Sequence, residues 1–424
     1  MPRLLVIGSG AREHALTARL ARETAGQDLA CAPGNPGCAR LARTLPADVS
    51  RPDDLLALAE HLDTDLTIVG PELPLSLGVA DRFAAAGRLL FGPTRAASAL
   101  EASKAFAKAF MTRHRIPTAR FKTCQSADEA LGVVSSGELG FPLVLKADGL
   151  AAGKGVAIAD DRPAAEAVVV AAMKERRFGT AGDCLVIEEC LTGPEVSFFA
   201  ICDGTRALAI GTAQDHKRIF DGDRGPNTGG MGAFAPSPLV NDELADRVMT
   251  LIVEPTVSGM ADEGRPFRGF LYAGLMLTAS GPKVVEFNVR LGDPEAQVVL
   301  PLIDEPLLPL LTAAAAGDLR QTTCRIGSDR HVGVVLASRG YPESSESNQN
   351  IDGVEDAERL DGVNVYHAGT ANRDGRLVTA GGRVLTVVGR GPDFAAATAR
   401  AYAGVSKIHF DGMQYRRDIG KKAL

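Results

Sequence analysis

The residues best suited to chemistry lie in a glycine-rich stretch that follows a short apolar run. Lys146 and Lys154 bracket this stretch, and Gly149, Gly153 and Gly155 lie in it. Glycine lets the backbone turn tightly and approach a ligand closely. Backbone N–H groups exposed in such a loop, together with two ammonium groups, suit a polyphosphate. The stretch therefore predicts a phosphate-binding loop at the end of a strand.

This loop departs from the nucleotide-binding pattern G-x-x-x-x-G-K-[ST]. The spacing from Gly149 to Gly153 is one residue too short, and Gly155 stands where a magnesium-binding hydroxyl is required. We therefore expect a phosphate cradle of another kind. The alternative is a glycine-rich surface hairpin, because residues 156–158 resume an apolar run.

A second group of functional residue types follows a predicted hairpin whose strands are residues 269–278 and 283–287. Strand alternation places Glu286, Asn288 and Arg290 on one face. A carboxylate and an amide oxygen two residues apart suit a hard cation such as magnesium. The alternative is a solvated face of a sheet.

The start of the chain resembles a βαβ unit. Residues 3–7 predict a buried strand, the turn at Gly8, Ser9 and Gly10 follows it, and a helix is expected from residue 15. This arrangement places an anion site at the helix N-terminus. A dinucleotide fingerprint needs a third glycine where Glu13 stands, which argues against NAD.

The elements that position these residues can be read from the alternation of apolar runs and turns. Further strands at 29–32, 66–69 and 89–91 end in Gly/Pro turns, with helices at 52–61 and 77–86 between them. The alternation predicts a parallel doubly wound sheet with ligands at the carboxyl ends of its strands.

The middle and end of the chain predict two further regions. Residues 203–240 are expected to form a long loop, and a long glycine-rich loop in an enzyme is typically a lid or a binding loop. A boundary is expected near 319–328. The tail lacks clustered ionisable groups, which indicates a packing domain.

Composition narrows the function classes. The chain has 424 residues, enough for several domains, and its net charge of −6 argues against a nucleic-acid binder. No apolar run is long enough to span a bilayer, and we expect no signal peptide. Seven cysteines without a Cys-x-x-Cys pair favour reduced thiols and a cytoplasmic location over disulfides or a zinc site.

Seven segments taken together resemble one family. They are residues 6–16, 32–35, 68–72, 146–156, 214–218, 225–232 and 286–290. In this order they are similar to phosphoribosylamine–glycine ligases, the glycinamide ribonucleotide synthetases of the ATP-grasp superfamily. The likeness extends from residue 3 to residue 420, so it covers nearly the whole chain.

The resemblance implies an α/β and α+β multidomain fold. Residues 1–102 would form a Rossmann-like substrate domain with a parallel sheet. Residues 103–320 would form an ATP-grasp domain, with 118–192 as a mobile lid over ATP, and residues 321–424 a C-terminal domain with a mixed sheet.

The resemblance also implies an ATP site. Lys104 and Lys146 would contact phosphates beneath a mobile loop. Glu188, Glu189 and Leu191 would meet adenine, partly through backbone, and Glu195 would bind ribose. The full implied set is Lys104, Lys146, Gly149, Gly153, Lys154, Gly155, Glu188, Glu189, Leu191 and Glu195.

For the other substrates, the resemblance implies that Asp215 holds the glycine ammonium and Arg290 its carboxylate. Lys146, Asp215 and Arg290 would be the catalytic residues. The implied substrate-binding set is Gly8, Ser9, Gly10, Asn35, Pro71, Glu72, Asp215, Lys217, Gly229, Gly230, Met231, Arg290 and Asp293.

Glu286 and Asn288 would bind magnesium or manganese. Met276 stands where many ATP-grasp enzymes have a further acidic ligand, which leaves a second metal position in doubt. Ser9 and Ala11 stand where the family often has Asn and Gly; we expect both to be tolerated.

The implied reaction joins glycine to 5-phosphoribosylamine in purine biosynthesis, with ATP consumed through glycyl phosphate. Phosphoryl transfer needs positioning and charge neutralisation more than a protein nucleophile, and the chain shows no Ser/His/Asp or Cys/His set. We expect a monomer or weak homo-oligomer with no nucleic-acid or membrane partner. Alternatives are another ATP-grasp ligase, an NAD oxidoreductase and a non-catalytic nucleotide-binding protein.

Overall fold

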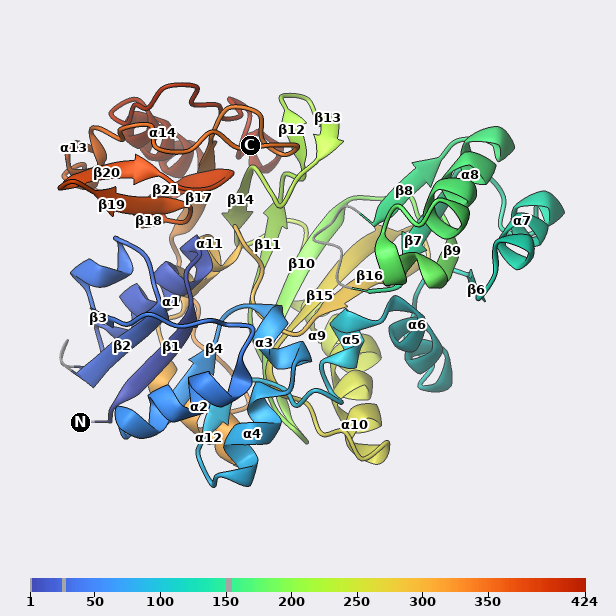
Figure 1. The fold of residues 1–424 in the computed structure, drawn as a ribbon, viewed down its shortest axis with the longest axis horizontal. Helices are drawn as coiled ribbons and strands as arrows, with labels where there is room; N and C mark the ends of the chain where they lie inside the picture. The colour runs from blue at the N-terminus through green and yellow to red at the C-terminus, as the bar shows by residue number, and fades with distance from the viewer. Residues whose placement is uncertain (1, 25–27, 150–154) are drawn as a thin grey trace.

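The computed structural model describes residues 2–24, 28–149 and 155–424. The N-terminal sheet lies at the lower left of Figure 1, the C-terminal strands above it, and a small lobe projects to the right. A long central sheet connects the C-terminal strands with the base of this lobe (Figure 1). No helix in the described ranges is both long and apolar enough to cross a membrane.

The N-terminal region is the predicted parallel sheet with flanking helices. Its strands are β1 (Leu4–Gly8), β2 (Leu29–Pro33), β3 (Arg43–Thr44), β4 (Leu66–Val69) and β5 (Leu90–Phe91). Its helices are α1 (Ala11–Leu20), α2 (Pro52–His61), α3 (Glu72–Ser76) and α4 (Val79–Ala85). The strand order β3-β2-β1-β4-β5 reverses at β1, and ligands of such sheets bind at that reversal, beyond the carboxyl ends of the strands.

The helix predicted over residues 77–86 is present as α4, which begins two residues later and ends one residue earlier. The segment contains α4 alone, and α3 precedes it, since Gly78 interrupts the two with φ of 89°. This left-handed conformation is favourable for glycine and ends the first helix. Glu72 consequently lies in the first turn of its own short helix, at the carboxyl end of β4.

The centre of the molecule is an antiparallel sheet of eight strands in the order β16-β15-β10-β11-β14-β17-β21-β18. The strands before residue 300 are β10 (Glu195–Asp203), β11 (Ala207–Asp215), β14 (Gly232–Ala235), β15 (Arg268–Thr278) and β16 (Gly281–Asn288). Those of the C-terminal region are β17 (Arg330–Ala337), β18 (Val363–His367) and β21 (Arg383–Gly391). Because β14 pairs with β17, the C-terminal strands continue the central sheet rather than forming a sheet of their own.

The prediction of a long loop over residues 203–240 is wrong. The segment contains β11, β14 and the hairpin of β12 (Arg218–Phe220) and β13 (Arg224–Asn227). Gly211 and the polar residues of the segment conceal β11 in the sequence, but β11 is paired along its length with β10 and at its end with β14. Cross-strand partners, rather than local propensity, decide that this segment is a sheet.

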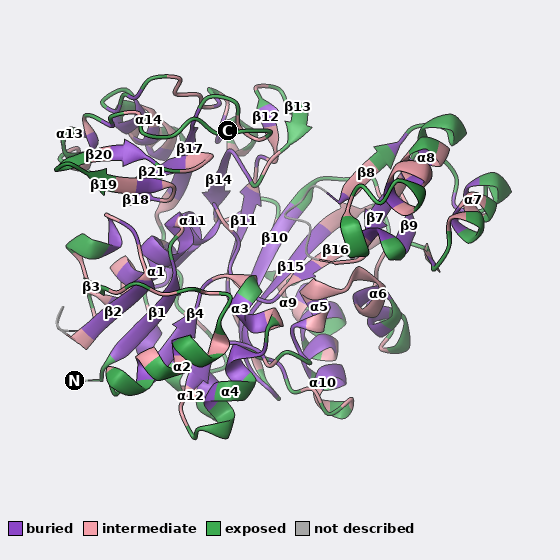
Figure 2. Ribbon diagram, in the orientation of Figure 1, coloured by how far each residue is buried: buried purple, intermediate pink, exposed green. Residues whose placement is uncertain are grey.

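The projecting lobe is a four-stranded sheet in the order β6-β9-β7-β8, covered by two helices. Its elements are β6 (Phe121–Cys124), α7 (Ala127–Ser136), β7 (Leu143–Ala147), β8 (Val156–Ala159), α8 (Arg162–Val169) and β9 (Leu185–Glu189). The buried apolar residues between Cys124 and Ile187 form a core of their own. Figure 2 shows this core as a buried layer between strands and helices, separate from the central sheet.

The remaining helices cover the central sheet and the C-terminal strands. They are α5 (Ala99–Ala102), α6 (Lys104–Arg113), α9 (Asp242–Val248), α10 (Glu254–Asp262), α11 (Ala296–Val299), α12 (Leu307–Ala316), α13 (Val354–Glu358) and α14 (Phe394–Val405). A small hairpin, β19 (Thr370–Arg373) and β20 (Arg376–Thr379), lies on the C-terminal region. The fold thus confirms the predicted parallel N-terminal sheet and the predicted sheet region at the C-terminus.

Candidate functional site

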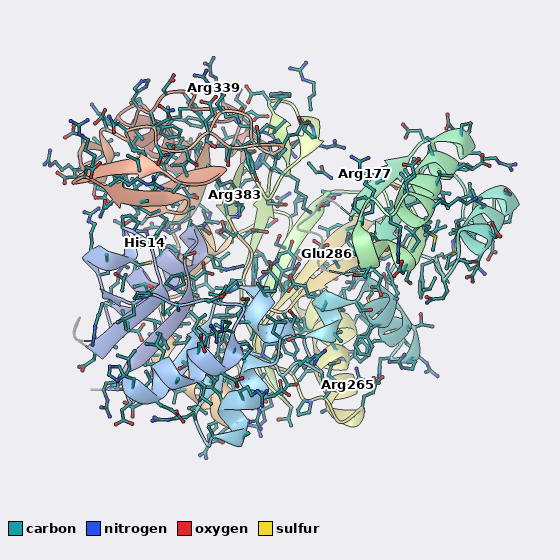
Figure 3. The ribbon with its side chains drawn as sticks, in the orientation of Figure 1. His14, Arg177, Arg265, Glu286, Arg339 and Arg383 are labelled. Carbon is teal, nitrogen blue, oxygen red and sulfur yellow. The ribbon has the colours of Figure 1, made fainter. Side chains whose placement is uncertain are left out.

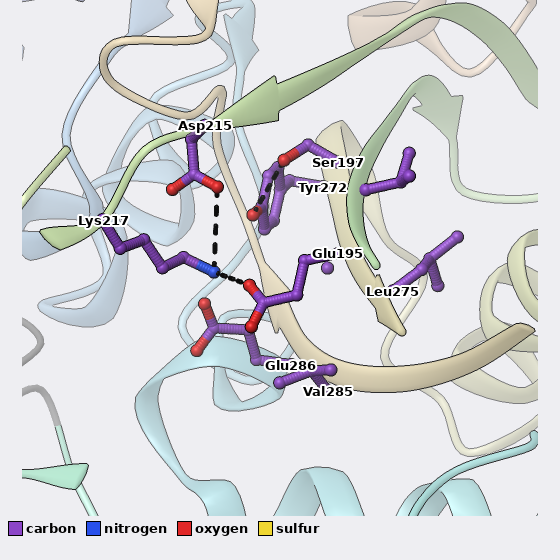
Figure 4. A pocket seen from close by; sticks show the side chains of 10 residues that line it. Glu195, Ser197, Asp215, Lys217, Tyr272, Leu275, Val285 and Glu286 are labelled. Carbon is purple, nitrogen blue, oxygen red and sulfur yellow. Dashed lines mark hydrogen bonds and ion pairs between the residues drawn. The ribbon is translucent and has the colours of Figure 1, made fainter. Parts of the chain in front are cut away.

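A small cleft that encloses about 10 Å³, room for about one water molecule, lies among strands of the central sheet. Its lining comes from β10, β11, β15 and β16, and consists of Glu195, Val196, Ser197, Asp215, Lys217, Tyr272, Gly274, Leu275, Val285 and Glu286. In Figure 4, Lys217 projects between the carboxylates of Asp215 and Glu195, and Glu286 lies beside them. Three residues expected from the sequence to bind substrate or ribose therefore share this cleft with a predicted metal ligand.

The predicted metal ligands lie on one face of β16, as strand alternation requires. Glu286, Asn288 and Arg290 are half-buried, whereas Phe287 and Val289 between them are buried. Burial disfavours the charged carboxylate, but Lys217 and Lys146 outweigh it and lower the pKa of Glu286. An ionised carboxylate and an amide oxygen on one face fit a hard divalent cation.

Lys146 extends from β7 of the lobe to β16, the strand that carries the predicted metal ligands. Its Nζ donates to the Val285 carbonyl at 3.0 Å, where the pairing of β15 with β16 shifts by one residue. The same Nζ lies 2.8 Å from Glu188 Oε1. Lys146 thus lies between the base of the glycine-rich loop and the predicted metal site.

Glu188 is held between two lysines. Lys108 Nζ donates to its other carboxylate oxygen at 2.7 Å, and all three side chains are at most 7% exposed. Burial lowers the pKa of Lys108 to about 8, against the opposing charge of Glu188. We did not assign Lys108 to the site from sequence. The signal is its position four residues after Lys104, which places both on one face of α6.

The start of the glycine-rich loop is tied to α6. Lys104 Nζ donates to the Gly149 carbonyl at 2.9 Å, and Asp148 accepts from Ser103 Oγ at 3.1 Å and from the Ala105 N–H at 3.2 Å. Asp148 therefore shapes this backbone at the helix N-terminus. Gly153 and Lys154 lie outside the described residues, and Gly155 directly precedes β8.

The expected adenine and ribose residues lie at the end of β9 and the start of β10. The side chain of Glu189 binds Arg120, with Nε to Oε2 at 2.7 Å. Leu191 is half-buried in the connection that follows, and Glu195 pairs with Lys217. The carboxylates of Glu188 and Glu189 are bound to the chain's own cations. The backbone at this end of β9 is therefore the part still available to an adenine base.

Of the two residues expected to bind glycine, Asp215 lines the cleft, whereas Arg290 follows the end of β16 outside that lining. Arg290 is bound by two carboxylates, with Nη2 to Glu101 at 2.8 Å and Nε to Glu72 at 3.2 Å. Burial lowers the pKa of Arg290, but Glu101 and Glu72 outweigh it and raise the value. Burial raises the pKa of Asp215 despite the charge of Lys217.

Glu295 is a buried carboxyl beside this cleft that we did not single out from sequence. Ser197 Oγ lies 3.3 Å from Glu295 Oε1 and 3.1 Å from the Tyr272 hydroxyl. Burial, reinforced by the charge of Asp215, raises the pKa of Glu295 to about 7. Its position near Asp293 in the sequence is the only signal available without a structure.

The Gly8–Gly10 turn is closed by a carboxylate of the chain itself. Glu13 Oε2 accepts from the Gly10 N–H at 2.6 Å, and a Cβ at Gly8 would lie 2.5 Å from the Glu13 side chain. Arg12 pairs with Glu13 at 2.5 Å. Glu13 thus occupies the place that a dinucleotide would need, which is a physical reason against the NAD alternative.

The remaining predicted substrate residues surround this turn. Asn35 Nδ2 donates to the Ser9 carbonyl at 2.9 Å, and a Cβ on Gly10 would lie 3.4 Å from Asp293 Oδ2. Pro71 precedes Glu72 at the end of β4. Gly229 and Gly230 lead into the buried Met231, and a Cβ on Gly230 would lie 2.4 Å from Pro294. The structure therefore brings the three predicted segments around residues 10, 230 and 293 together.

These features define a class of protein. Lys104 and Lys146 converge from α6 and β7 on the start of the glycine-rich stretch, and Glu286 on β16 lies near their charges. With the small lobe set beside the central sheet, this is the arrangement of an ATP-grasp ligase. The biotin carboxylase domain of 2-oxoglutarate carboxylase from Hydrogenobacter thermophilus has this fold. It is 16% identical, with a TM-score of 0.76 over 98% of this chain and 92% of its own.

The particular family follows from more specific matches. The N, ATP-grasp (A) and C domains of phosphoribosylglycinamide synthetase match residues 2–101, 102–296 and 331–422. The crystal structure of phosphoribosylamine–glycine ligase from Thermotoga maritima is 34% identical, with a TM-score of 0.84 over 98% of this chain and 99% of that one.

Curated relatives carry the same name. Phosphoribosylamine–glycine ligase of Xylella fastidiosa is 49% identical over 100% of this chain and 98% of its own length. That of Caulobacter vibrioides is 47% identical over 99% and 98%. The chain belongs to the phosphoribosylglycinamide synthetase family, and it is an ATP-dependent ligase of purine biosynthesis.

Proposed function

We propose how this chain's residues carry out the ligation of glycine to 5-phosphoribosylamine, with ATP converted to ADP and phosphate. The observation that carries the proposal is that the charged residues around Glu286 form two chemically different sides. Lys104, Lys146 and Glu286 form the side suited to ATP phosphates. Asp215 and Arg290 form the side suited to a zwitterionic amino acid, whose ammonium and carboxylate they complement.

On the ATP side, Lys104 and Lys146 contact phosphates, and the loop that includes Gly149, Gly153, Lys154 and Gly155 covers them. Glu188, Glu189 and Leu191 offer backbone to adenine, and Glu195 meets ribose. The support is the position of Lys104 and Lys146 at the start of this loop, where Lys146 lies near the end of β7 and Lys104 bonds to the Gly149 carbonyl. A loop over the phosphates has a function here, because an acyl phosphate hydrolyses when water enters.

Glu286 and Asn288 would hold magnesium or manganese, which would supply charge neutralisation for phosphoryl transfer when bound. The support is an ionised carboxylate next to an amide oxygen on one strand face. Magnesium is typically bound by one or two protein carboxylates together with substrate phosphates. Met276 offers no oxygen ligand, so a second ion would have to rely on phosphates and water.

The reaction proceeds in two balanced steps. A glycine carboxylate oxygen attacks the γ-phosphorus of ATP, the bond to the bridging oxygen breaks, and ADP leaves with that electron pair. The amine nitrogen of phosphoribosylamine then attacks the carbonyl carbon of glycyl phosphate. Phosphate leaves, and the nitrogen loses one proton as the amide forms. Arg290 orients the carboxylate, and Asp215 binds the ammonium.

The amine substrate is assigned to the segments around Gly8–Gly10, Asn35, Pro71–Glu72, Gly229–Met231 and Asp293, with Lys217 facing the cleft. We further propose three domains, 1–102, 103–320 and 321–424, with 118–192 as a lid, consistent with the separate apolar core of the lobe. We propose a cytoplasmic monomer or weak homo-oligomer.

Isotope transfer tests the chemistry. Glycine labelled with heavy oxygen in its carboxylate should pass one labelled oxygen to the released phosphate, and the amide should keep the other. Arg290→Lys should slow this step about ten- to hundredfold, because a planar two-donor fork is replaced by a point charge. Unlabelled phosphate, in a reaction that still forms glycinamide ribonucleotide, would rule out the acyl phosphate.

A further inference from the structure

The C-terminal strands reach the proposed amine-substrate segments through Arg383, the first residue of β21. Its Nη1 donates to the Gly229 carbonyl and to the Asp293 carbonyl, both at 2.6 Å, and lies 3.4 Å from Asp293 Oδ1. One guanidinium nitrogen therefore joins two segments that are 64 residues apart in the chain. Figure 3 shows Arg383 where the C-terminal strands meet the middle of the molecule.

Tyr341 holds the other polar group of the same glycine. Its hydroxyl accepts from the Gly229 N–H at 2.9 Å, so both backbone groups of Gly229 are bound by the C-terminal region. A Cβ on Gly229 would lie 3.2 Å from both Arg383 Cζ and the Tyr341 hydroxyl. A Cβ on Gly382 would lie 2.4 Å from the Tyr341 ring, so glycine at both positions makes this contact possible.

A third contact reaches the N-terminal turn. The His367 carbonyl, at the end of β18, accepts from Asn35 Nδ2 at 2.8 Å, and the His367 N–H donates to His14 Nδ1 at 2.8 Å. Asn35 also donates to the Ser9 carbonyl. The C-terminal region thus contacts the segments of Gly229, Asp293 and Asn35. These contacts contradict the interpretation of the C-terminal region as a packing domain only.

We propose that Arg383 and Tyr341 are positioning residues for the phosphorylated amino sugar. They hold the Gly229–Gly230 turn against Asp293, so that these groups face the amine substrate in one fixed geometry. This inference rests on the assignment of those segments to the amine substrate made above.

The chemistry of the contact supports this role. Asp293 is half-buried beside the Gly10 turn, and desolvation favours its neutral form, but Arg383 and Arg12 keep its pKa low. The side chain of Arg383 is 22% exposed, so water screens it little. Removing Arg383 leaves two carbonyls and a carboxylate without their shared donor, while the ATP side of the cleft keeps its contacts.

The test compares substrates within one set of variants: Arg383→Ala, Arg383→Lys and Tyr341→Phe. Arg383→Ala should raise the KM for 5-phosphoribosylamine and weaken calorimetric binding of glycinamide ribonucleotide about ten- to hundredfold, the range for lost hydrogen bonds to a charged group. The KM for ATP should change less than about twofold. Tyr341→Phe removes one hydroxyl only and should give a smaller shift in the same direction.

Arg390→Ala is the matched control, because Arg390 lies on the same strand, is half-exposed, and makes only a 3.7 Å ion pair. Equal changes in the KM values of ATP, glycine and the amine, or no change in Arg383→Ala and Tyr341→Phe, would overturn the inference.

Asp293→Asn separates the two proposals. If Asp293→Asn raises the KM for the amine while Arg383→Ala does not, only the positioning role fails. If Asp293→Asn and Glu72→Gln both leave the KM for the amine unchanged, the assignment of these segments to the amine substrate fails.

Discussion

The ATP side and the amine side of the proposed site are built differently. On the ATP side, Lys104, Lys108, Lys146 and Glu188 come from one stretch of fewer than a hundred residues, and they meet a single strand of the central sheet. On the amine side, the contacts join segments from the N-terminal sheet, the central sheet and the C-terminal strands. The first side is encoded locally; the second exists only after three regions have packed together.

The charge balance differs in the same way. On the ATP side, Lys108 and Lys146 flank the buried carboxylate of Glu188, and Lys104 bonds to the Gly149 carbonyl, which leaves positive charge for phosphates. On the amine side, Arg290 is paired with Glu72 and Glu101, and Arg383 with Asp293. A buried charge without a partner is costly, so the amine side is neutralised before any substrate binds. The comparison predicts that variants on the ATP side change the affinity for ATP through charge. Variants on the amine side should change the affinity for the amine substrate through geometry.

The largest expected effect is at the metal ligands. Glu286→Gln combined with Asn288→Ala should lower turnover at ordinary magnesium concentrations by at least about a thousandfold, since a bound metal supplies several kcal/mol of charge stabilisation. The unfolding curve should change little. Steady-state kinetics across a magnesium series measures this, and near-normal turnover at low magnesium would place the metal elsewhere.

A second variant tests the buried lysine pair. Lys108→Met leaves Glu188 with Lys146 alone, and loss of one partner of a buried ion pair should lower the free energy of unfolding by about 3–5 kcal/mol. Lys122→Met is the control, because its ion pair with Glu138 is exposed and worth about 0–1 kcal/mol. Denaturant titration compares the two; equal losses would show that Glu188 does not depend on Lys108.

The contact of Lys146 with phosphates is tested by Lys146→Met. Loss of a charged contact worth about 1.5–3 kcal/mol should weaken ATP binding by one to two powers of ten. Lys174→Met, on the exposed surface of the lobe, should leave it unchanged. Calorimetric titration with ATP measures both, and unchanged ATP binding and turnover in Lys146→Met would remove this lysine from the site.

The smallest effect is a pH dependence on the amine side. The folded chain raises the pKa of Glu295 from 4.5 to about 7, so between these values it binds more protons than the unfolded chain. The contribution to stability is therefore present below pH 4.5 and is lost as the pH rises to 7. Glu295→Gln should flatten this part of the stability profile, whereas Glu243→Gln, exposed in α9, should not. A profile with the same slope in Glu295→Gln would assign the titration to another group.

Much of the fold was predictable from sequence because it is local. Strands of the parallel sheet are apolar runs that end in Gly/Pro turns, and β1 differs from its predicted bounds by one residue. The long loop predicted over residues 203–240 failed, because β11 is recognisable only through its partners β10 and β14. The helix predicted over 77–86 is α4, which begins at Val79 because Gly78 before it adopts a left-handed conformation.

The sequence by itself determined the residues that lie on one strand or one loop. Glu286, Asn288 and Arg290 share a face because strand residues alternate, and Lys146 precedes the glycine-rich loop whatever the tertiary structure. Only the tertiary structure decided which charges are buried and paired: Lys108 with Glu188, Arg290 with Glu101, and Arg383 with the Gly229 and Asp293 carbonyls. The physical reason is that pairing depends on desolvation and on contacts between distant segments, and neither has a periodic signature in a single sequence.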